Sequence, residues 1–95
     1  MPLEHLVWLT PKPDTPDTQM EQIAAAIRNL THIPGVLGIS AGRNLTDRAG
    51  GATYGAIITL ESFDFLEPYL QHPDHVALGG ILREYCEVQA LDYDC

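Results

Sequence analysis

The sequence predicts an α+β fold in which helices cover one face of an antiparallel sheet, as in a ferredoxin-like sandwich. Four segments alternate apolar and polar residues with the period of a half-buried strand, and the segments between them repeat apolar residues at helical spacing. Their order along the chain is β-α-β-β-α-α-β. A length of 95 residues is enough for one domain, so we expect a single domain over residues 1–95.

The first predicted strand, residues 3–10, has two apolar faces. Its alternation places His5, Val7 and Leu9 on one face and Leu6 and Trp8 on the other. One layer of helices can cover only one of these faces. Because so small a domain is also marginally stable alone, we expect an oligomer.

A helix is predicted to follow, with Thr15 as its N-cap and Pro16 as its first residue. It should run to about residue 32, and Pro34-Gly35 should end it. Its apolar residues recur at helical spacing: Met20, Ile23, Ala24, Ile27 and Leu30.

Two strands are predicted in the middle of the chain. Glycines within residues 36–44 lower the strand propensity there and suggest a bulge or a close backbone approach. A loop over residues 45–51 leads to the strand at residues 53–61. Alternation in that strand places one set of side chains on a common face: Tyr54, Ala56, Ile58 and Leu60.

A second helical region is predicted at residues 62–71, with Ser62 or Asp64 as its cap. Pro68 predicts that this helix starts late or kinks, because a proline beyond the first turn clashes with the carbonyl four residues back. Pro73 favours an extended His72 and is itself a favourable first residue for a further short helix.

The last predicted strand covers residues 85–94 and places Cys86, Val88 and Ala90 on one face. We interpret Cys86 as a small core residue rather than a nucleophile, because no partner base is evident near it in the sequence.

The net charge of −8 argues against nucleic acid and anionic lipid as partners, because both carry negative charge. No apolar stretch approaches the length of a membrane span. The start "MPLEHLVWLT" lacks the features of a secretory signal, and two cysteines do not form a disulfide framework. We therefore expect a cytoplasmic protein.

The stretch "YLQHPDHVAL", residues 69–78, leaves three interpretations open. It is a helix start whose histidines bond the free amide groups, or a proton-transfer site, or a metal site. For proton transfer, the positive end of the helix dipole should keep His75 neutral, with Asp74 partly opposing this. For a metal, His72 and His75 supply two ligands, and His5 or Asp74 would have to complete the set.

Several motifs together resemble the stress-responsive dimeric α/β-barrel (Dabb) family and, within it, the polyketide cyclases. The most specific is Tyr69-x-x-His72-Pro73-x-His75-Val76. The others are His5-Leu6-Val7, Ile33-Pro34-Gly35, Gly42, Phe63 and Leu91-Asp92-Tyr93.

The resemblance implies a homodimer whose two sheets pack together to close a barrel, with a ligand pocket between sheet and helices in each subunit. It implies that His75 is the general base, Tyr69 its hydrogen-bonding partner and His5 a polar group of the pocket. Ala26 falls where the cyclase has a pocket tyrosine, and Tyr54 where a histidine is often found. The expected substrate-binding residues are Tyr54, Val7, Leu9, Ala26, Ile58, Leu78 and Val88.

We therefore expect a cofactor-free and metal-free acid–base enzyme that acts on an apolar, oxygen-bearing small molecule, for example by aldol-type ring closure of a polyketide-like chain. His75 would take a proton from a carbon flanked by carbonyls, and Tyr69 or Tyr54 would donate a hydrogen bond to the enolate. Two alternatives remain open at this point: a non-catalytic stress-responsive binding protein and a cofactor-free monooxygenase.

Overall fold

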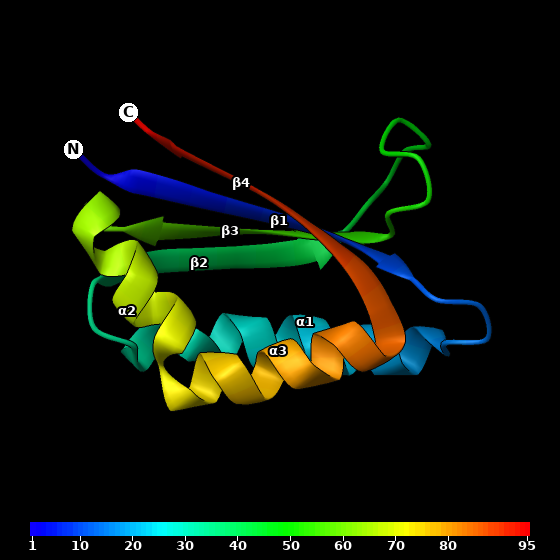
Figure 1. Ribbon diagram of the computed structural model, residues 1–95. Helices are drawn as coiled ribbons and strands as arrows, with labels where there is room; N and C mark the ends of the chain where they lie inside the picture. The colour runs from blue at the N-terminus through cyan, green and yellow to red at the C-terminus, as the bar shows by residue number, and fades with distance from the viewer.

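The computed structural model describes residues 1–95 and contains one antiparallel sheet with the strand order β2-β3-β1-β4 (Figure 1). Its strands are β1 (Leu3–Pro11), β2 (Val36–Arg43), β3 (Tyr54–Leu60) and β4 (Cys86–Asp94). In this order the first strand, β1, lies inside the sheet and pairs with the last strand, β4, which forms one edge. This strand order confirms the predicted ferredoxin-like α+β fold.

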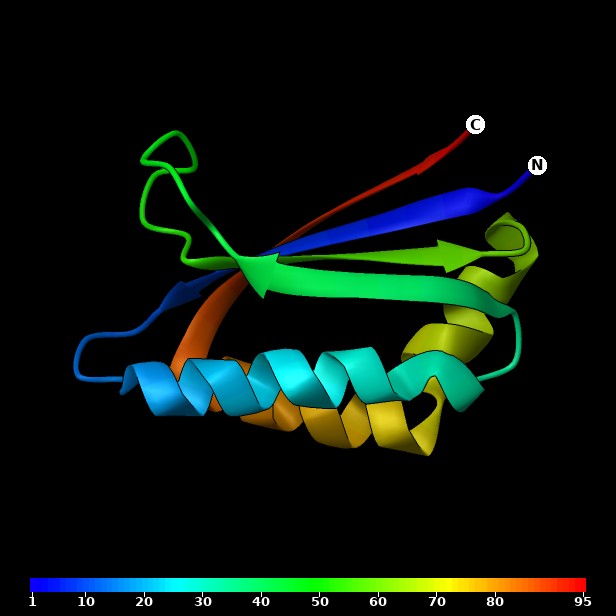
Figure 2. The same cartoon turned by 180° about the vertical axis from the view of Figure 1, so that it is seen from behind.

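The helices all lie on one face of the sheet, as Figures 1 and 2 show from opposite sides. Helices α1 (Asp17–Arg28) and α3 (Pro73–Tyr85) run side by side along this face. The short helix α2 (Leu66–Gln71) lies at one end of the sheet. Two 3₁₀ turns, η1 (Asn29–His32) and η2 (Phe63–Phe65), extend α1 and precede α2. None of the helices has the length and apolar composition needed to cross a bilayer.

The predicted alternation of the strands is confirmed in the core. His5, Val7 and Leu9 of β1 are all buried on the face that the helices cover. Their partners on β3 are Ile58, Ala56 and Tyr54, which are buried too. The stripe predicted for the first helix is also buried against this face: Met20, Ile23, Ala24, Ile27 and Leu30.

The predicted N-cap of the first helix is wrong. Helix α1 begins at Asp17, its N-cap is Pro16, and no side chain caps it. The hydroxyl of Thr15 instead donates a hydrogen bond to the carbonyl oxygen of Tyr85, 2.9 Å away at the end of α3. Thr15 thus joins the β1–α1 connection to a part of the chain that is distant in sequence.

The two prolines of the second helical region act as predicted. Pro68 is the third residue of α2, so the helix starts late and the proline stays within its first turn. Pro73 is the first residue of α3, and His72 is its N-cap, whose Nδ1 accepts a hydrogen bond of 3.1 Å from the amide of Asp74. Helix α3 spans 13 residues and is longer than the short helix predicted.

The predicted irregularity in β2 is a bulge. Val36 pairs with Leu60 and Gly38 with Thr59, so Leu37 has no partner on β3 and its side chain is exposed.

The face of the sheet opposite the helices carries apolar side chains that nothing in the chain covers. They come from three strands: Leu6, Trp8, Ile57, Leu91 and Tyr93. A hollow of about 540 Å³ opens on this side next to Leu6, Trp8 and Ile57. We call this surface the open face.

The turn before β2 yields a stability prediction. Gly35 has φ +90, and a Cβ built there would lie 2.4 Å from Cδ1 of Phe65. We expect Gly35→Ala to lower the free energy of unfolding by about 2–4 kcal/mol, through left-handed strain and overpacking. Chemical denaturation followed by circular dichroism measures this change.

Gly80→Ala is the matched control, because a Cβ at Gly80 on α3 meets no atom within 4 Å. Alanine is the better helix former, so this variant should be equally stable or up to about 1 kcal/mol more stable. Equal effects of the two substitutions would contradict the role given to Gly35.

Candidate functional site

A cleft of about 710 Å³ lies between helix α3 and strands β1 and β4. Its volume is within the range of small-molecule sites, about 300–1,000 Å³. Apolar groups form most of its wall, from Val7, Leu70, Leu82, Val88 and Ala90. His5 and His75 bring imidazole rings to it from β1 and α3. We call it the His75 cleft.

His75 is held in one tautomer by the backbone. Its Nδ1 lies 3.1 Å from the carbonyl oxygen of Leu70. A carbonyl oxygen can only accept a hydrogen bond, so Nδ1 carries the proton and Nε2 keeps its lone pair. Because His75 is the third residue of α3, directly after the Pro73 start, this geometry follows from the break between α2 and α3.

The electrostatic surroundings keep the His75 ring neutral. Burial is the main cause that lowers the pKa of His75 below its usual value of 6.5, and the nearby His5 lowers it further. The hydrogen bond to Leu70 partly opposes this shift in the pKa. The result is an imidazole that can accept a proton at neutral pH, and its pKa is lowered by burial and His5 rather than by the helix dipole considered from the sequence.

Tyr69 packs its ring against both histidines of the cleft. Its ring centroid lies 4.7 Å from that of His75 and 5.8 Å from that of His5. Burial raises the pKa of Tyr69 to about 12, so the hydroxyl keeps its proton at neutral pH. This hydroxyl has no hydrogen-bond partner in the chain, but Tyr69 is only 1% exposed and is not among the residues that line the cleft.

His5 is oriented by a carboxylate that the sequence analysis did not single out. In the β1–β4 pairing, His5 lies opposite Asp92, and the distance from Nδ1 to Oδ1 is 2.5 Å. The carboxylate accepts from Nδ1, so Nε2 is the nitrogen free for other contacts. The alternation of the last strand indicates the face on which Asp92 lies. Asp92 is two positions after Ala90, so it shares a face with Cys86, Val88 and Ala90.

Tyr54 does not line the His75 cleft. Its hydroxyl donates a 2.5 Å hydrogen bond to Glu21 of α1, and the Arg43 guanidinium lies over its ring, 5.2 Å from the centroid. Burial, with the bond to Glu21, raises the pKa of Tyr54 to about 12. Tyr54 therefore serves the packing of β3 against α1.

Of the other predicted lining residues, Val7 and Val88 contact the cleft. The rest belong to the core or its margin without lining the cleft: Leu9, Ala26, Ile58 and Leu78. Alternation identifies the face of a strand on which a side chain lies, but it does not identify where along the strand a cleft opens. These residues could therefore be assigned to the core face but not to the cleft.

The cleft also includes residues that the sequence analysis did not predict. Gly79 forms part of the wall and contributes no side chain to fill the space. Lys12 and Arg83 lie at the cleft, where the Lys12 ammonium donates a 2.6 Å hydrogen bond to the Arg83 carbonyl. Two of the five lysines and arginines of the chain therefore lie beside the cleft, together with Glu87.

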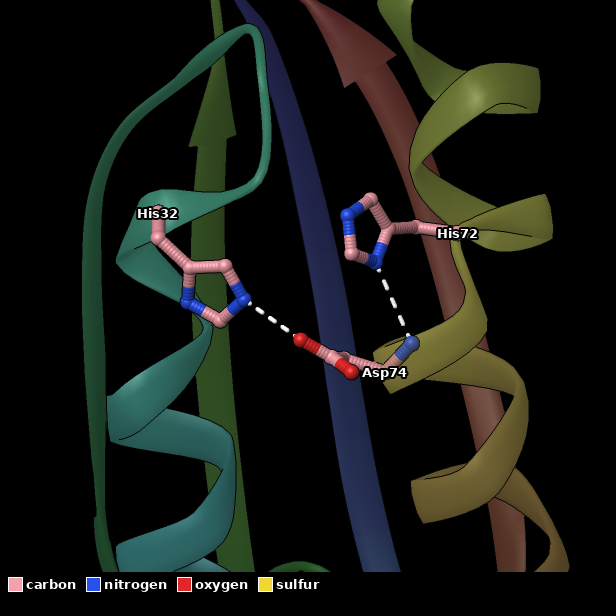
Figure 3. A group of neighbouring side chains, drawn as sticks. All are labelled: His32, His72 and Asp74. Carbon is pink, nitrogen blue, oxygen red and sulfur yellow. Dashed lines mark hydrogen bonds and ion pairs between the residues drawn. The ribbon is translucent and has the colours of Figure 1, made fainter.

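His72 and His75 do not form a joint metal site. His75 faces the cleft, whereas His72 lies with Asp74 and His32 in a separate cluster (Figure 3). In that cluster, His32 Nε2 is 2.6 Å from Asp74 Oδ2. His32 was not predicted as a site residue.

Cys86 also lines the cleft, but its thiol donates a hydrogen bond to the Leu82 carbonyl at 3.1 Å. Burial raises the pKa of the Cys86 thiol, which disfavours a thiolate. This geometry agrees with the interpretation of Cys86 as a core residue.

Known proteins resemble this chain in sequence or in fold over nearly its whole length. Olivetolic acid cyclase of Cannabis sativa is 29% identical over 90 residues, which cover 92% of this chain and 89% of the relative. A structure from Bacteroides fragilis, described as a dimeric protein of unknown function with a ferredoxin-like fold, superposes with a TM-score of 0.85 at 26% identity. The match covers 99% of this chain and 96% of that one.

Hydroxynitrile lyase from Passiflora edulis has the same fold, with a TM-score of 0.85 at 24% identity over 97% of this chain and 91% of the lyase. The family model described as the stress-responsive A/B barrel domain matches residues 3–95. The chain therefore belongs to the Dabb family of stress-responsive α/β-barrel domains.

Proposed function

We propose that this Dabb protein binds an apolar, oxygen-bearing small molecule in the His75 cleft and performs cofactor-free acid–base chemistry on it, such as the ring closure of a polyketide-like chain. One observation carries the proposal. A neutral His75, with Nδ1 bonded to Leu70 and Nε2 unprotonated, contacts a tyrosine that keeps its proton.

The first step is proton abstraction. His75 Nε2 takes a proton from a carbon flanked by two carbonyl groups, which is acidic enough for an imidazole base. The Tyr69 hydroxyl donates a hydrogen bond to the enolate oxygen that forms. General-base catalysis of this kind contributes about 10²–10⁴-fold to the rate.

The second step closes the ring. The enolate carbon attacks a second carbonyl carbon of the same chain, and a carbon–carbon bond forms while the attacked oxygen becomes an alkoxide. The imidazolium of His75 returns its proton to that alkoxide, so the base is regenerated and no oxidant or reductant is consumed. No metal or cofactor takes part in either step.

His5 and Asp92 act as a polar support of the cleft in this proposal. The Asp92 carboxylate fixes the His5 ring through Nδ1, and His5 Nε2 is left to contact an oxygen of the ligand. The relationship to olivetolic acid cyclase supports a cyclase-type activity, because the likeness covers nearly the whole of both chains.

We also propose that the chain forms a homodimer through its open face. Apolar side chains from three strands meet there without cover, and a second copy of the sheet would close a barrel. The relative from Bacteroides fragilis is described as dimeric, which supports this arrangement. We place the protein in the cytoplasm, because unpaired thiols at Cys86 and Cys95 suit a reducing compartment.

The role of His75 as a base is tested by His75→Ala. We expect kcat to fall by about 10²-fold or more while KM stays within a few-fold, because proton transfer is felt mainly in the transition state. Exchange of the α-proton of a β-keto ester in D₂O, followed by NMR, measures the base without knowledge of the natural substrate.

His72→Ala is the matched control for this test. Loss of its cap bond to Asp74 should lower the free energy of unfolding by about 0.5–2 kcal/mol and leave the exchange rate nearly unchanged. If His75→Ala lowers stability and leaves turnover intact, His75 is structural and the chain is a binding protein. Oxygen consumption with the ligand would instead point to a monooxygenase.

The pH dependence follows from the lowered pKa of His75. The neutral base persists below the usual value of 6.5, so kcat/KM should be constant above that pH and fall only at lower pH. A pH–rate profile with its acidic limb at or above pH 6.5 would contradict the assignment.

The lowered pKa of His75 also makes the stability of the folded protein depend on pH. As pH falls below about 6.5, the unfolded chain takes up a proton at His75 before the folded chain does. The contribution of His75 to stability is therefore present above pH 6.5 and is lost as pH falls through its lower folded-state pKa. This part of the acid destabilisation should be absent from His75→Gln, as measured by thermal melting at several pH values.

Trp8→Glu tests the dimer. A charge on the open face should dissociate or unfold the protein, because the charge would be buried without a partner in the sheet-to-sheet contact. Light scattering at micromolar concentration measures the mass. Ile81→Glu, at an exposed position of α3 on the helical side, should remain dimeric. A stable wild-type monomer would rule out the barrel.

A further inference from the structure

A second cluster of potential ligands lies outside the His75 cleft. His32 ends the 3₁₀ turn η1, His72 caps α3, and Asp74 is the second residue of α3. One ligand atom from each residue lies within 4.8 Å of those of the other two (Figure 3). We propose that these three side chains form a binding site for a divalent transition metal, with zinc as its first candidate.

His32 already has the orientation of a metal ligand. Its Nδ1 lies 3.0 Å from the carbonyl oxygen of Asn29, so this nitrogen donates and Nε2 faces Asp74. Histidines that bind metals commonly donate the other ring N–H to a carbonyl or carboxylate in this way. Nε2 and the Asp74 oxygen are 2.6 Å apart, and a metal bound by both atoms would replace this direct contact.

The His72 ring lies next to His32 and Asp74, but the lone pair of its Nδ1 is directed at the backbone amide of Asp74. That nitrogen accepts the amide N–H of Asp74, and the His72 ring lies edge-on to the His32 ring with centroids 5.7 Å apart. Figure 3 shows that both rings and the Asp74 carboxylate converge from η1 and the start of α3. Metal binding at Nδ1 would replace the cap bond, so the affinity is reduced by the loss of that bond.

The donor set selects the class of metal. Two imidazoles and one carboxylate suit zinc, copper, nickel or iron, whereas magnesium and calcium prefer oxygen ligands alone. Three protein ligands leave one position of a tetrahedral zinc for water. The side chains of His32 and Asp74 are 54% and 56% exposed, so an ion can reach the site from solvent.

A metal at this position would join two distant parts of the chain. His32 and Asp74 are 42 positions apart in sequence, and a bond through the metal would tie the end of α1 to the start of α3. Such a link stabilises the folded state, because the site does not exist in the unfolded chain. The cluster does not include His75, so zinc binding can be measured separately from the proposed acid–base chemistry.

Isothermal titration with zinc chloride tests the site, together with thermal melting at increasing zinc concentration. We expect one zinc per chain and a rise in melting temperature. His32→Gln and Asp74→Asn should each weaken zinc binding by about tenfold or more and lose most of the thermal gain, since each removes a ligand. Circular dichroism before titration confirms that each variant is folded.

His75→Gln is the matched control, because it changes the other histidine of the His72-Pro73-Asp74-His75 stretch. It should bind zinc as the wild type does. The proposal is overturned if the wild type shows no saturable binding of zinc at micromolar concentration. It is also overturned if His75→Gln abolishes binding while His32→Gln retains it, since the ligands would then belong to the His75 cleft.

Discussion

The break between α2 and α3 at His72–Pro73 positions the functional groups of this molecule. Proline cannot continue the preceding helix, so α2 ends at Gln71 and a new helix starts in a different direction. The start of α3 then places His75 in the first turn of the helix, where its Nδ1 donates a hydrogen bond back to the Leu70 carbonyl. Without the break, this carbonyl would be engaged within a continuous helix and His75 would have no fixed tautomer.

The same break separates the two histidines of the motif. His72 stays outside the helix as its cap, next to Asp74 and His32, while His75 faces the sheet. One short segment therefore supplies one half-buried imidazole to the cleft and another half-buried imidazole to the surface cluster. The two rings differ in their partners: His75 Nδ1 donates to the Leu70 carbonyl, whereas His72 Nδ1 accepts the amide N–H of Asp74.

The sequence predicted the fold well, because local signals determine most of it. Alternation assigned the faces of β1 and β3, and Pro68 and Pro73 located the start of α2 and α3. The failures involve partners distant in sequence. Thr15 bonds to Tyr85 rather than capping α1, and the contact of His32 with Asp74 depends on how α1 and α3 pack. Periodicity within one segment carries no information about such contacts.

Some features of the candidate site could be predicted from the sequence and others could not. Tyr69 and His75 are in ring contact across the helix break, but the hydrogen bond that the resemblance implied between them is absent, because His75 Nδ1 bonds to the Leu70 carbonyl. Asp92 was not predicted as a site residue, because only the β1–β4 register places it opposite His5. Tyr54 lies on the predicted face of β3, but its hydroxyl bonds to Glu21 of α1 and does not reach the cleft. The position of a residue along the strand determines which helix it contacts.

Nitrogen-15 NMR of the histidine rings measures whether His75 is a neutral base with a free Nε2. At pH 7 we expect a His75 ring with its proton on Nδ1 and an unprotonated Nε2, and replacement of Tyr69 by Phe should not change that tautomer because Leu70 holds it. A His75 ring that is doubly protonated at pH 7, or that carries its proton on Nε2, would rule out this role for His75.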